Sequence, residues 1–257
     1  MKNMSFEAVI FDMDGVITKT AVIHATAWKK MFDEYLRGRE KKYGESFREF
    51  IYPNDYLTYV DGKPRYEGVV SFLESRGIEL PFGDVADAPE AETICGLGNR
   101  KNEAFNKIIE NDGVEVFPST VTLINTLKRA GIKLGVASSG KNCKPVLEAV
   151  NLLEIFGARV DGAVLAEMGL QGKPEPDIFT TTCKILDTLP AKSIVVEDAV
   201  AGVCAGARGK FGLVLGIARE NNAVELQQNG ADFVVSDLEE INGLPELNAL
   251  FLKYSGK

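Results

Sequence analysis

Two aspartates at the end of a short apolar run are the residues of this chain best suited to chemistry. Asp12 and Asp14 follow 8–11, a run that is typical of a buried strand. Since one residue separates them, both carboxylates can approach a single ligand at the carboxyl edge of a sheet. One carboxylate can attack phosphorus while the other transfers protons, and a hard cation such as Mg²⁺ would relieve their mutual repulsion. An ordinary surface turn is the alternative, and the later elements decide between the two.

Three later loops add groups that can bind a phosphate or a cation. The loop Ser138–Asn142 offers hydroxyls, backbone N–H groups and a lysine directly after a predicted strand, an arrangement suited to phosphate. Lys173 precedes a proline and can neutralise a transferring phosphoryl group. Glu197 and Asp198 end another apolar run, where acids require a metal or a cation as partner. Taken alone, the first loop favours an ordinary turn and Lys173 could be a solvated lysine, whereas for Glu197 and Asp198 a metal site is favoured over a helix cap.

The pattern after residue 112 predicts strands that alternate with helices. Strands are expected at 133–137, 160–165, 193–196, 213–217 and 233–235, and helices at 119–130, 145–150, 176–186, 199–207 and 223–229. Ser119 is the expected N-cap of the first of these helices. Such alternation predicts an α/β protein with a doubly wound parallel sheet, covered by helices on both faces.

The region before residue 112 has a different pattern. Amphipathic helices are expected at 22–36, 66–76 and 100–110, with no strand between residues 20 and 112. We therefore expect a discontinuous α/β core domain, residues 1–19 and 113–257, with an inserted α-helical cap domain at 20–112. The insert leaves the core close to Asp12 and Asp14, so it is expected to act as a lid.

Composition excludes several classes of partner. The 257 residues carry a net charge of −8, which argues against binding to nucleic acid or to an anionic membrane surface. No apolar run approaches the ~20 residues that span a bilayer, and residues 1–7 lack a signal-peptide core. The four cysteines show no C-x-x-C spacing and there is a single histidine, so we expect no zinc site and a reduced, cytoplasmic protein.

The joint order of these motifs resembles the haloacid dehalogenase superfamily of aspartate-nucleophile phosphotransferases, and the resemblance covers the whole chain. The segment Phe11–Thr18, followed by His24 and Trp28 in a helix, is similar to the β-phosphoglucomutase-like branch. This resemblance implies a Rossmann-like core with a helical cap. Lys19 and Gly140 depart from the pattern of that branch, which has an acid and a serine there. Segments 61–65 and 95–102 are also similar to modules found beside trehalose-processing enzymes.

The resemblance also implies roles for particular residues of the core. Asp12 would be the nucleophile and Asp14 the general acid/base, while Ser138 and Lys173 would hold the transferring phosphoryl group. Magnesium would be bound by Asp12, the carbonyl of Asp14, Glu197 and Asp198.

Further residues would bind the substrate. Arg65, Lys141 and Asn142 would hold a distal phosphate, and Lys101 and Asn102 would contact the sugar, with Ser139 in the same phosphate loop. His24 would connect the cap hinge to Asp14, although a helix histidine without a catalytic role is an equal alternative. For Trp28 we favour a place in the cap core over stacking on a ligand.

The resemblance, together with these residues, implies an Mg²⁺-dependent enzyme that acts on a hexose phosphate through an aspartyl phosphate. Interconversion of β-glucose 1-phosphate and glucose 6-phosphate ranks ahead of simple hydrolysis of a sugar phosphate, because a second phosphate site is expected. A non-catalytic binding module is the remote alternative. We expect a monomer whose partner is a small sugar phosphate.

Overall fold

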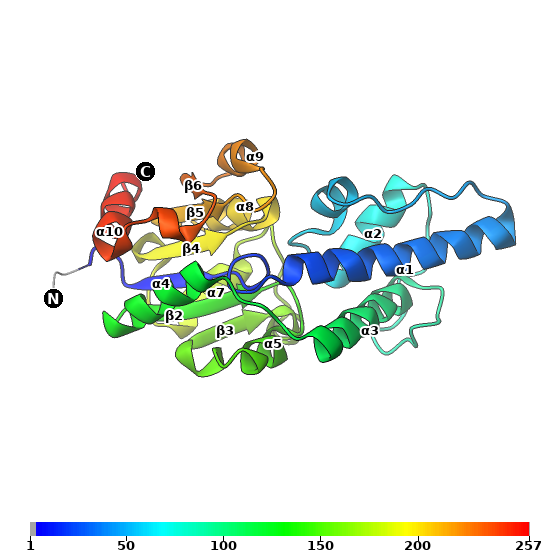
Figure 1. Cartoon of the computed structure of the whole chain (residues 1–257), viewed down its shortest axis with the longest axis horizontal. Helices are drawn as coiled ribbons and strands as arrows, with labels where there is room; N and C mark the ends of the chain where they lie inside the picture. Colours follow the sequence, from blue (N-terminus) through cyan, green and yellow to red (C-terminus); the bar gives the residue numbers. More distant parts are fainter. Residues whose placement is uncertain (1–3, 257) are drawn as a thin grey trace. The chain divides into compact units, whose positions relative to one another are not determined.

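The chain folds into two compact units, which we describe separately. The structure is a computed structural model that describes residues 4–256 (Figure 1). The core unit comprises the described residues up to Lys19 together with those from Val114 onward, and the helical unit comprises Thr20–Gly113.

A six-stranded parallel sheet forms the centre of the core unit, in the order β3-β2-β1-β4-β5-β6. Its strands are β1 (Ala8–Phe11), β2 (Lys133–Ser138), β3 (Ala158–Asp161), β4 (Ser193–Glu197), β5 (Leu213–Ile217) and β6 (Phe233–Val235). Strand β1 is fully buried and pairs with both β2 and β4, so that Ile10 lies opposite Gly135 on one side and Val195 on the other. Such apolar strands need cover on both faces, because their side chains alternate between the two faces.

Helices provide that cover. They are α4 (Pro118–Arg129), α5 (Cys143–Ala149), α6 (Gly162–Met168), α7 (Asp177–Ile185), α8 (Val200–Arg208), α9 (Ala223–Gln228) and α10 (Gly243–Tyr254). Helix α7 packs on β1, β2 and β3, while α8 and α9 pack on β4, β5 and β6. Helices α4 and α10 pack against each other and on β2 and β5. Because parallel crossovers are right-handed, the reversal of strand order at β1 places helices on both faces of the sheet. Helices α7, α8 and α9 cover one face, and α4 and α10 cover the other.

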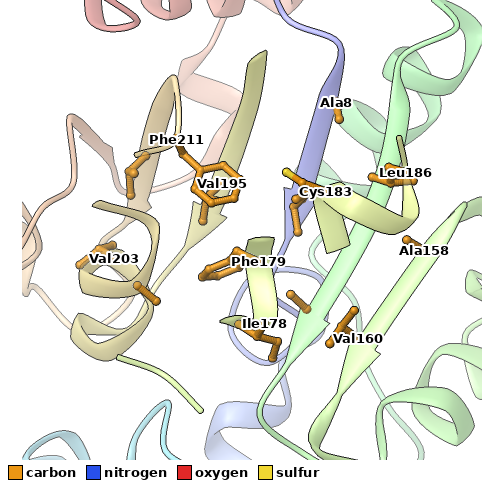
Figure 2. Packing of buried hydrophobic residues seen from close by; sticks show 14 of the residues in the cluster. Ala8, Ala158, Val160, Ile178, Phe179, Cys183, Leu186, Val195, Val203 and Phe211 are labelled. Carbon is orange, nitrogen blue, oxygen red and sulfur yellow. The ribbon is translucent and has the colours of Figure 1, made fainter. Parts of the chain in front are cut away.

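The core under α7 and α8 combines two phenylalanines with smaller apolar side chains (Figure 2). Phe179 of α7 and Phe211 meet edge to face, with ring centroids 5.9 Å apart. Ala8 and Val195 line the sheet side of this cluster and Val203 the α8 side. This packing holds the strands rigidly, and so the loops at their carboxyl ends are held too.

The helical unit contains α1 (Thr20–Tyr43), a π-helical turn (Tyr56–Val60), α2 (Arg65–Ser75) and α3 (Ile94–Asp112). Its own core is aromatic, with Phe32 stacked on Trp28 and packed against Phe50 and Phe72 at centroid separations of 4.0–5.5 Å. Residues 20–113 contain no strand, as the sequence predicts. Within residues 4–256 no helix is both long enough and apolar enough to span a bilayer.

Two local predictions are wrong. The strand expected at 160–165 ends at Asp161, whose side chain accepts hydrogen bonds from the backbone of Ala163 and Val164 and so begins helix α6. A short apolar run is compatible with a strand or with a helix, and here the N-cap formed by Asp161 favours the helix. Ser119 is not the N-cap of α4, because the helix begins at Pro118, a residue that favours the first helical position.

Candidate active site

The carboxyl end of β1 lies at the switch point of the sheet, where β2 flanks it on one side and β4 on the other. Ligands of open α/β sheets bind at such a point because the flanking loops diverge there. Asp12 directly follows β1, Ser138 ends β2, and Glu197 ends β4. The parallel register therefore brings three chemistry-bearing side chains to one edge.

A buried lysine joins two of these strand ends. The Lys173 ammonium donates to Asp12 Oδ1 and to Glu197 Oε1, each at 2.5 Å, and lies 3.4 Å from the Ala137 carbonyl oxygen. Lys173 and Glu197 are almost fully buried, and Asp12 is 6% exposed. Removing the lysine would leave two buried carboxylates unpaired, a change that costs about 3–5 kcal/mol in comparable pairs.

The electrostatics of this triad favour a further cation. Burial raises the pKa of Asp12 well above its usual value, Lys173 opposes the rise, and the charges of Glu197 and Asp14 add to it. Burial would lower the pKa of Lys173, but the charges of Asp12 and Glu197 outweigh it and hold that pKa above the usual value. The lysine therefore stays charged, and one ammonium cannot balance several carboxylates.

Asp14 lies beside the phosphate-binding loop predicted after β2. Its Oδ2 is 3.4 Å from Ser138 Oγ, which in turn accepts a hydrogen bond from the Gly140 N–H at 3.2 Å. Asp14 is half-buried, whereas Ser138 is fully buried. A proton carrier is thus placed next to hydroxyl and backbone donors that can bind phosphate oxygens.

Gly15 permits a close approach between two acidic loops. Its φ of +85° lies in the left-handed region, and a Cβ there would overlap the carboxylate of Asp198. Only glycine fits both demands. The carboxylate of Asp198 therefore lies directly against the loop that carries Asp12 and Asp14.

The oxygens gathered at this edge suit a hard divalent cation. Asp198 is half-buried, while both oxygens of Glu197 already accept hydrogen bonds, from Lys173 and from the backbone of Ala199. Glu197 could bind a metal only by sharing an oxygen with those donors. Within residues 4–256 no cluster of three or more His, Cys, Asp or Glu side chains is arranged to hold a metal. A magnesium site needs fewer than three such side chains, because Mg²⁺ commonly keeps several waters and binds one or two carboxylates plus phosphate oxygens. Asp12 and Asp198 fit that donor set.

The helical unit contains a second group of polar side chains. Arg65 begins α2 and donates from Nη2 to Asn102 Oδ1 on α3 at 2.8 Å. The side chain passes over Gly98, where a Cβ would lie 3.2 Å from Arg65 Cδ. Burial lowers the pKa of Arg65, but its guanidinium remains charged at neutral pH.

Lys101 lies deeper in the helical unit. Its ammonium contacts His24 Nδ1 and lies about 5 Å from the ring centroids of Trp28 and Phe105. His24 itself stacks on Phe105 at 4.0 Å. Lys101 and Trp28 are each only 4% exposed.

Comparison with known proteins assigns the family. A haloacid dehalogenase-like hydrolase model matches residues 6–210. The chain belongs to the haloacid dehalogenase-like hydrolase family. It is 45% identical over 237 residues to a β-phosphoglucomutase of Mycobacterium bovis, which covers 91% of this chain and 90% of the relative.

Two other matches also cover most of this chain. The chain is 36% identical to part of an uncharacterised glycosyl hydrolase of Mycobacterium tuberculosis, covering 91% of this chain but 17% of that protein. The crystal structure of a β-phosphoglucomutase from Clostridium difficile superimposes with a TM-score of 0.75 at 25% identity, covering 98% of this chain and all of that one. The family and these relatives make this protein an enzyme, a phosphomutase or a phosphatase.

The structure brings together the site residues that we expected in the core unit. It changes the expectation for Glu197, whose two oxygens already accept hydrogen bonds from Lys173 and Ala199. Asp12, Asp14, Ser138, Lys173, Glu197 and Asp198 all lie at one sheet edge. In the same loop as Ser138, Lys141 is exposed while Ser139 and Asn142 are half-buried. The preference for Trp28 as a core residue agrees with its burial, so its alternative assignment to substrate binding lacks support in the helical unit.

Sequence reasoning missed two residues after β5. Arg219 donates from Nε to the Gly15 carbonyl at 2.9 Å, and Asn222 Nδ2 lies 3.4 Å from the Asp198 carbonyl. The sequence could have indicated them by their position directly after a predicted strand. In a parallel sheet, the loop that follows β5 leaves from the same edge as the loop that carries Asp12.

Proposed function

We propose that this enzyme is an Mg²⁺-dependent phosphomutase that interconverts β-glucose 1-phosphate and glucose 6-phosphate through a phosphoryl group on Asp12. The observation that carries the proposal is the Asp12 carboxylate at the end of β1, held 2.5 Å from a fully buried Lys173. A carboxylate fixed beside an ammonium can attack a phosphoryl group whose charge the ammonium offsets. The name of the Mycobacterium bovis relative supports the choice of hexose.

The chemistry assigns one task to each aspartate. Phosphorylated Asp12 gives its phosphoryl group to a free hydroxyl of the hexose monophosphate, and the proton of that hydroxyl passes to Asp14. The hexose bisphosphate then returns its other phosphoryl group to Asp12. The ester bond to the sugar breaks in that step, and Asp14 protonates the departing oxygen. The position of Asp14 beside Ser138 Oγ, at 3.4 Å, supports this division of roles.

Asp12 and Asp198 would hold Mg²⁺, with the carbonyl of Asp14 as a further oxygen donor. The cation supplies charge neutralisation for the phosphoryl oxygens. Ser138 Oγ and the N–H groups of its loop would bind the same oxygens. Lys173 holds Asp12 and Glu197 in place through its two contacts.

A second phosphate distinguishes a mutase from a simple phosphatase. Arg65 is the strongest candidate to bind this phosphate. Its half-buried guanidinium is oriented by Asn102, and a guanidinium can donate two parallel hydrogen bonds to phosphate oxygens. Within the core unit, we propose Lys141 and Asn142 as phosphate contacts, and within the helical unit we propose Asn102 and Lys101 as contacts to the sugar. The contact between His24 and Lys101 is consistent with a role for both in orienting the helical unit's polar groups.

A sugar-phosphate phosphatase with the same phosphoryl-Asp12 is the second candidate, and the family name favours it. The deciding experiment incubates the protein with β-glucose 1-phosphate, Mg²⁺ and a hexose bisphosphate primer, and measures glucose 6-phosphate and inorganic phosphate separately. We expect isomer with little free phosphate. Phosphate release without isomer would make the enzyme a phosphatase, and no turnover of any phosphate ester would support a non-catalytic module.

We further propose that the enzyme acts as a monomer in the cytoplasm. All four cysteines are free and three of them are buried, which fits a reducing compartment. Light scattering on the purified protein tests the monomer directly.

A further inference from the structure

The loop after β5 reaches both acidic loops of the candidate site. Arg219 lies two residues beyond β5, and its Nε donates to the Gly15 carbonyl at 2.9 Å, across 204 residues of sequence. Asn222 in the same loop approaches the carbonyl of Asp198 at 3.4 Å. Both contacts are made to backbone carbonyls of the acidic loops, so we expect any effect on catalysis to pass through the backbone that these side chains hold.

The guanidinium of Arg219 is itself fixed at its other end. Its Nη1 donates to Asp237 Oδ2 at 2.9 Å and to the Ser236 carbonyl at 3.2 Å, and its Cζ lies 3.6 Å from the Phe117 ring centroid. The side chain is 16% exposed. A cation that is stacked, paired and largely buried is held in one rotamer, which makes it a precise anchor for a distant carbonyl.

Asp237 is equally well fixed. It caps a 3₁₀ turn (Leu238–Glu240) in a capping box, and its carboxylate accepts from the backbone of Glu239. Although burial would raise the pKa of Asp237, hydrogen bonding from Ser119, from the Glu239 backbone and from Arg219 keeps that pKa below its usual value. The acid is therefore ionised at neutral pH and keeps its hold on Arg219.

The anchored carbonyl belongs to the residue whose placement matters most in this loop. Gly15 follows Asp14, carries the positive φ, and packs its Cα against the Asp198 carboxylate. Its N–H donates to the Thr18 carbonyl at 2.8 Å, which closes a tight turn but leaves the peptide after Gly15 dependent on Arg219. A glycine without this contact has several backbone conformations open to it.

We propose that Arg219 is a positioning residue for phosphoryl transfer: by fixing the Gly15 carbonyl it sets the distance between the Asp14 loop and Asp198. It thereby orders the oxygen donors for Mg²⁺ and the carboxyl group that moves protons. The proposal rests on the proposed function of this site. Residues that orient metal ligands in this way typically change metal affinity or activity by about 10–100-fold when removed.

Two variants separate positioning from mere stabilisation. Arg219→Met keeps a long, unbranched side chain beside Phe117 but loses the guanidinium and every N–H donor. Asp237→Ala breaks the ion pair with Arg219 and leaves the contact with Gly15. Arg129→Ala is the matched control, since Arg129 is an exposed arginine of α4 whose guanidinium contacts Thr126.

The measurements are Mg²⁺ affinity of the ligand-free protein by calorimetry, kcat and KM for acetyl phosphate hydrolysis, and the melting temperature. For Arg219→Met we expect Mg²⁺ affinity and kcat to fall about tenfold or more while KM for acetyl phosphate changes less than about twofold. Asp237→Ala should lower the melting temperature but keep Mg²⁺ affinity and kcat within about threefold of the parent, because the Ser236 carbonyl and the Phe117 ring still hold the guanidinium that donates to Gly15. Arg129→Ala should match the parent in every measurement.

Two results would overturn the proposal: unchanged Mg²⁺ affinity and kcat in Arg219→Met, or the same loss in Asp237→Ala as in Arg219→Met. If Arg219→Met does not fold, Arg219→Lys takes its place, with an expected loss of about threefold or more because one ammonium cannot hold both Gly15 and Asp237. Should the parent hydrolyse no phosphate ester, the proposed function fails, whereas calorimetry with Mg²⁺ still tests Arg219.

Discussion

At the scale of single residues, the site depends on charges that are buried in pairs. Lys173 is tied to Asp12 and Glu197, and the half-buried Asp198 is the carboxylate that we propose as a metal ligand together with Asp12. Glu197 and Asp198 are neighbours in sequence but have different roles. Glu197 accepts hydrogen bonds from Lys173 and from the backbone of Ala199, and Asp198 lies against Gly15 in the Asp14 loop.

Asp198→Ala tests this division. We expect the Mg²⁺ affinity of the ligand-free protein to fall about tenfold or more, because a hard cation loses a carboxylate ligand. Calorimetry with Mg²⁺ measures it, and Glu148→Ala, which removes an exposed acid of α5, is the control. An unchanged affinity in Asp198→Ala would show that Asp198 is not a ligand.

Arg65→Ala tests the second phosphate site. A lost charge-assisted contact costs about 2 kcal/mol, so we expect mutase turnover to fall about 30-fold. Acetyl phosphate has no second phosphate, and its hydrolysis should change little. Arg48→Ala removes an exposed arginine of the same unit and should affect neither reaction. Equal losses on both substrates would remove Arg65 from substrate binding.

At the scale of elements, α2 and α3 pack closely because α3 has a glycine at the crossing. A Cβ at Gly98 would lie 2.6 Å from the Tyr66 ring, and that ring is held by a hydrogen bond from its hydroxyl to Asn99. Gly98→Ala should therefore reduce the free energy of unfolding by about 1–3 kcal/mol.

Gly38→Ala is the matched substitution, since Gly38 lies within α1 with nothing inside 4 Å of its Cβ position. It should raise the free energy of unfolding by about 0.5–1 kcal/mol through helix propensity alone. Urea denaturation measures both variants. A Gly98→Ala protein as stable as the parent would show that α2 and α3 can separate at no cost.

Two kinds of pattern predicted the elements. The strands near Asp12, Ser138 and Glu197 follow from short apolar runs, and the all-helical insert follows from amphipathic periodicity. The end of β3 could not be predicted, because the cap formed by Asp161 competes with a short apolar run that fits either structure. Arg219 was missed for another reason: its contact with Gly15 joins loops 204 residues apart, and local spacing carries no trace of it.

At the scale of the whole molecule, burial determines which groups can react. Burial raises the pKa of Cys183 to about 11 and the pKa of Cys143 further above its usual value, and Cys95 is fully buried. Cys204 is the half-buried one of the four. We expect one thiol at most to react with a thiol reagent at pH 8 in the native protein, and four after unfolding. Rapid native labelling of Cys143 would contradict the packing beside Asp14.

The two-unit organisation concentrates the proposed covalent chemistry in the core unit, at the carboxyl end of β1. The central claim is that one side chain there carries the transferred phosphoryl group. That claim predicts that Asp12→Asn, which keeps the volume of the side chain but loses its charge, retains the fold and loses about 10⁴-fold or more of the activity.

The most direct test locates the phosphoryl group itself. The enzyme is incubated with Mg²⁺ and a radiolabelled hexose bisphosphate, quenched in acid and digested, and the labelled peptide is sequenced by mass spectrometry. We predict a hydroxylamine-sensitive label on Asp12 that is absent from the Asp12→Asn variant. A label on Asp14 or on any other residue, or a label that persists in Asp12→Asn, would contradict the account.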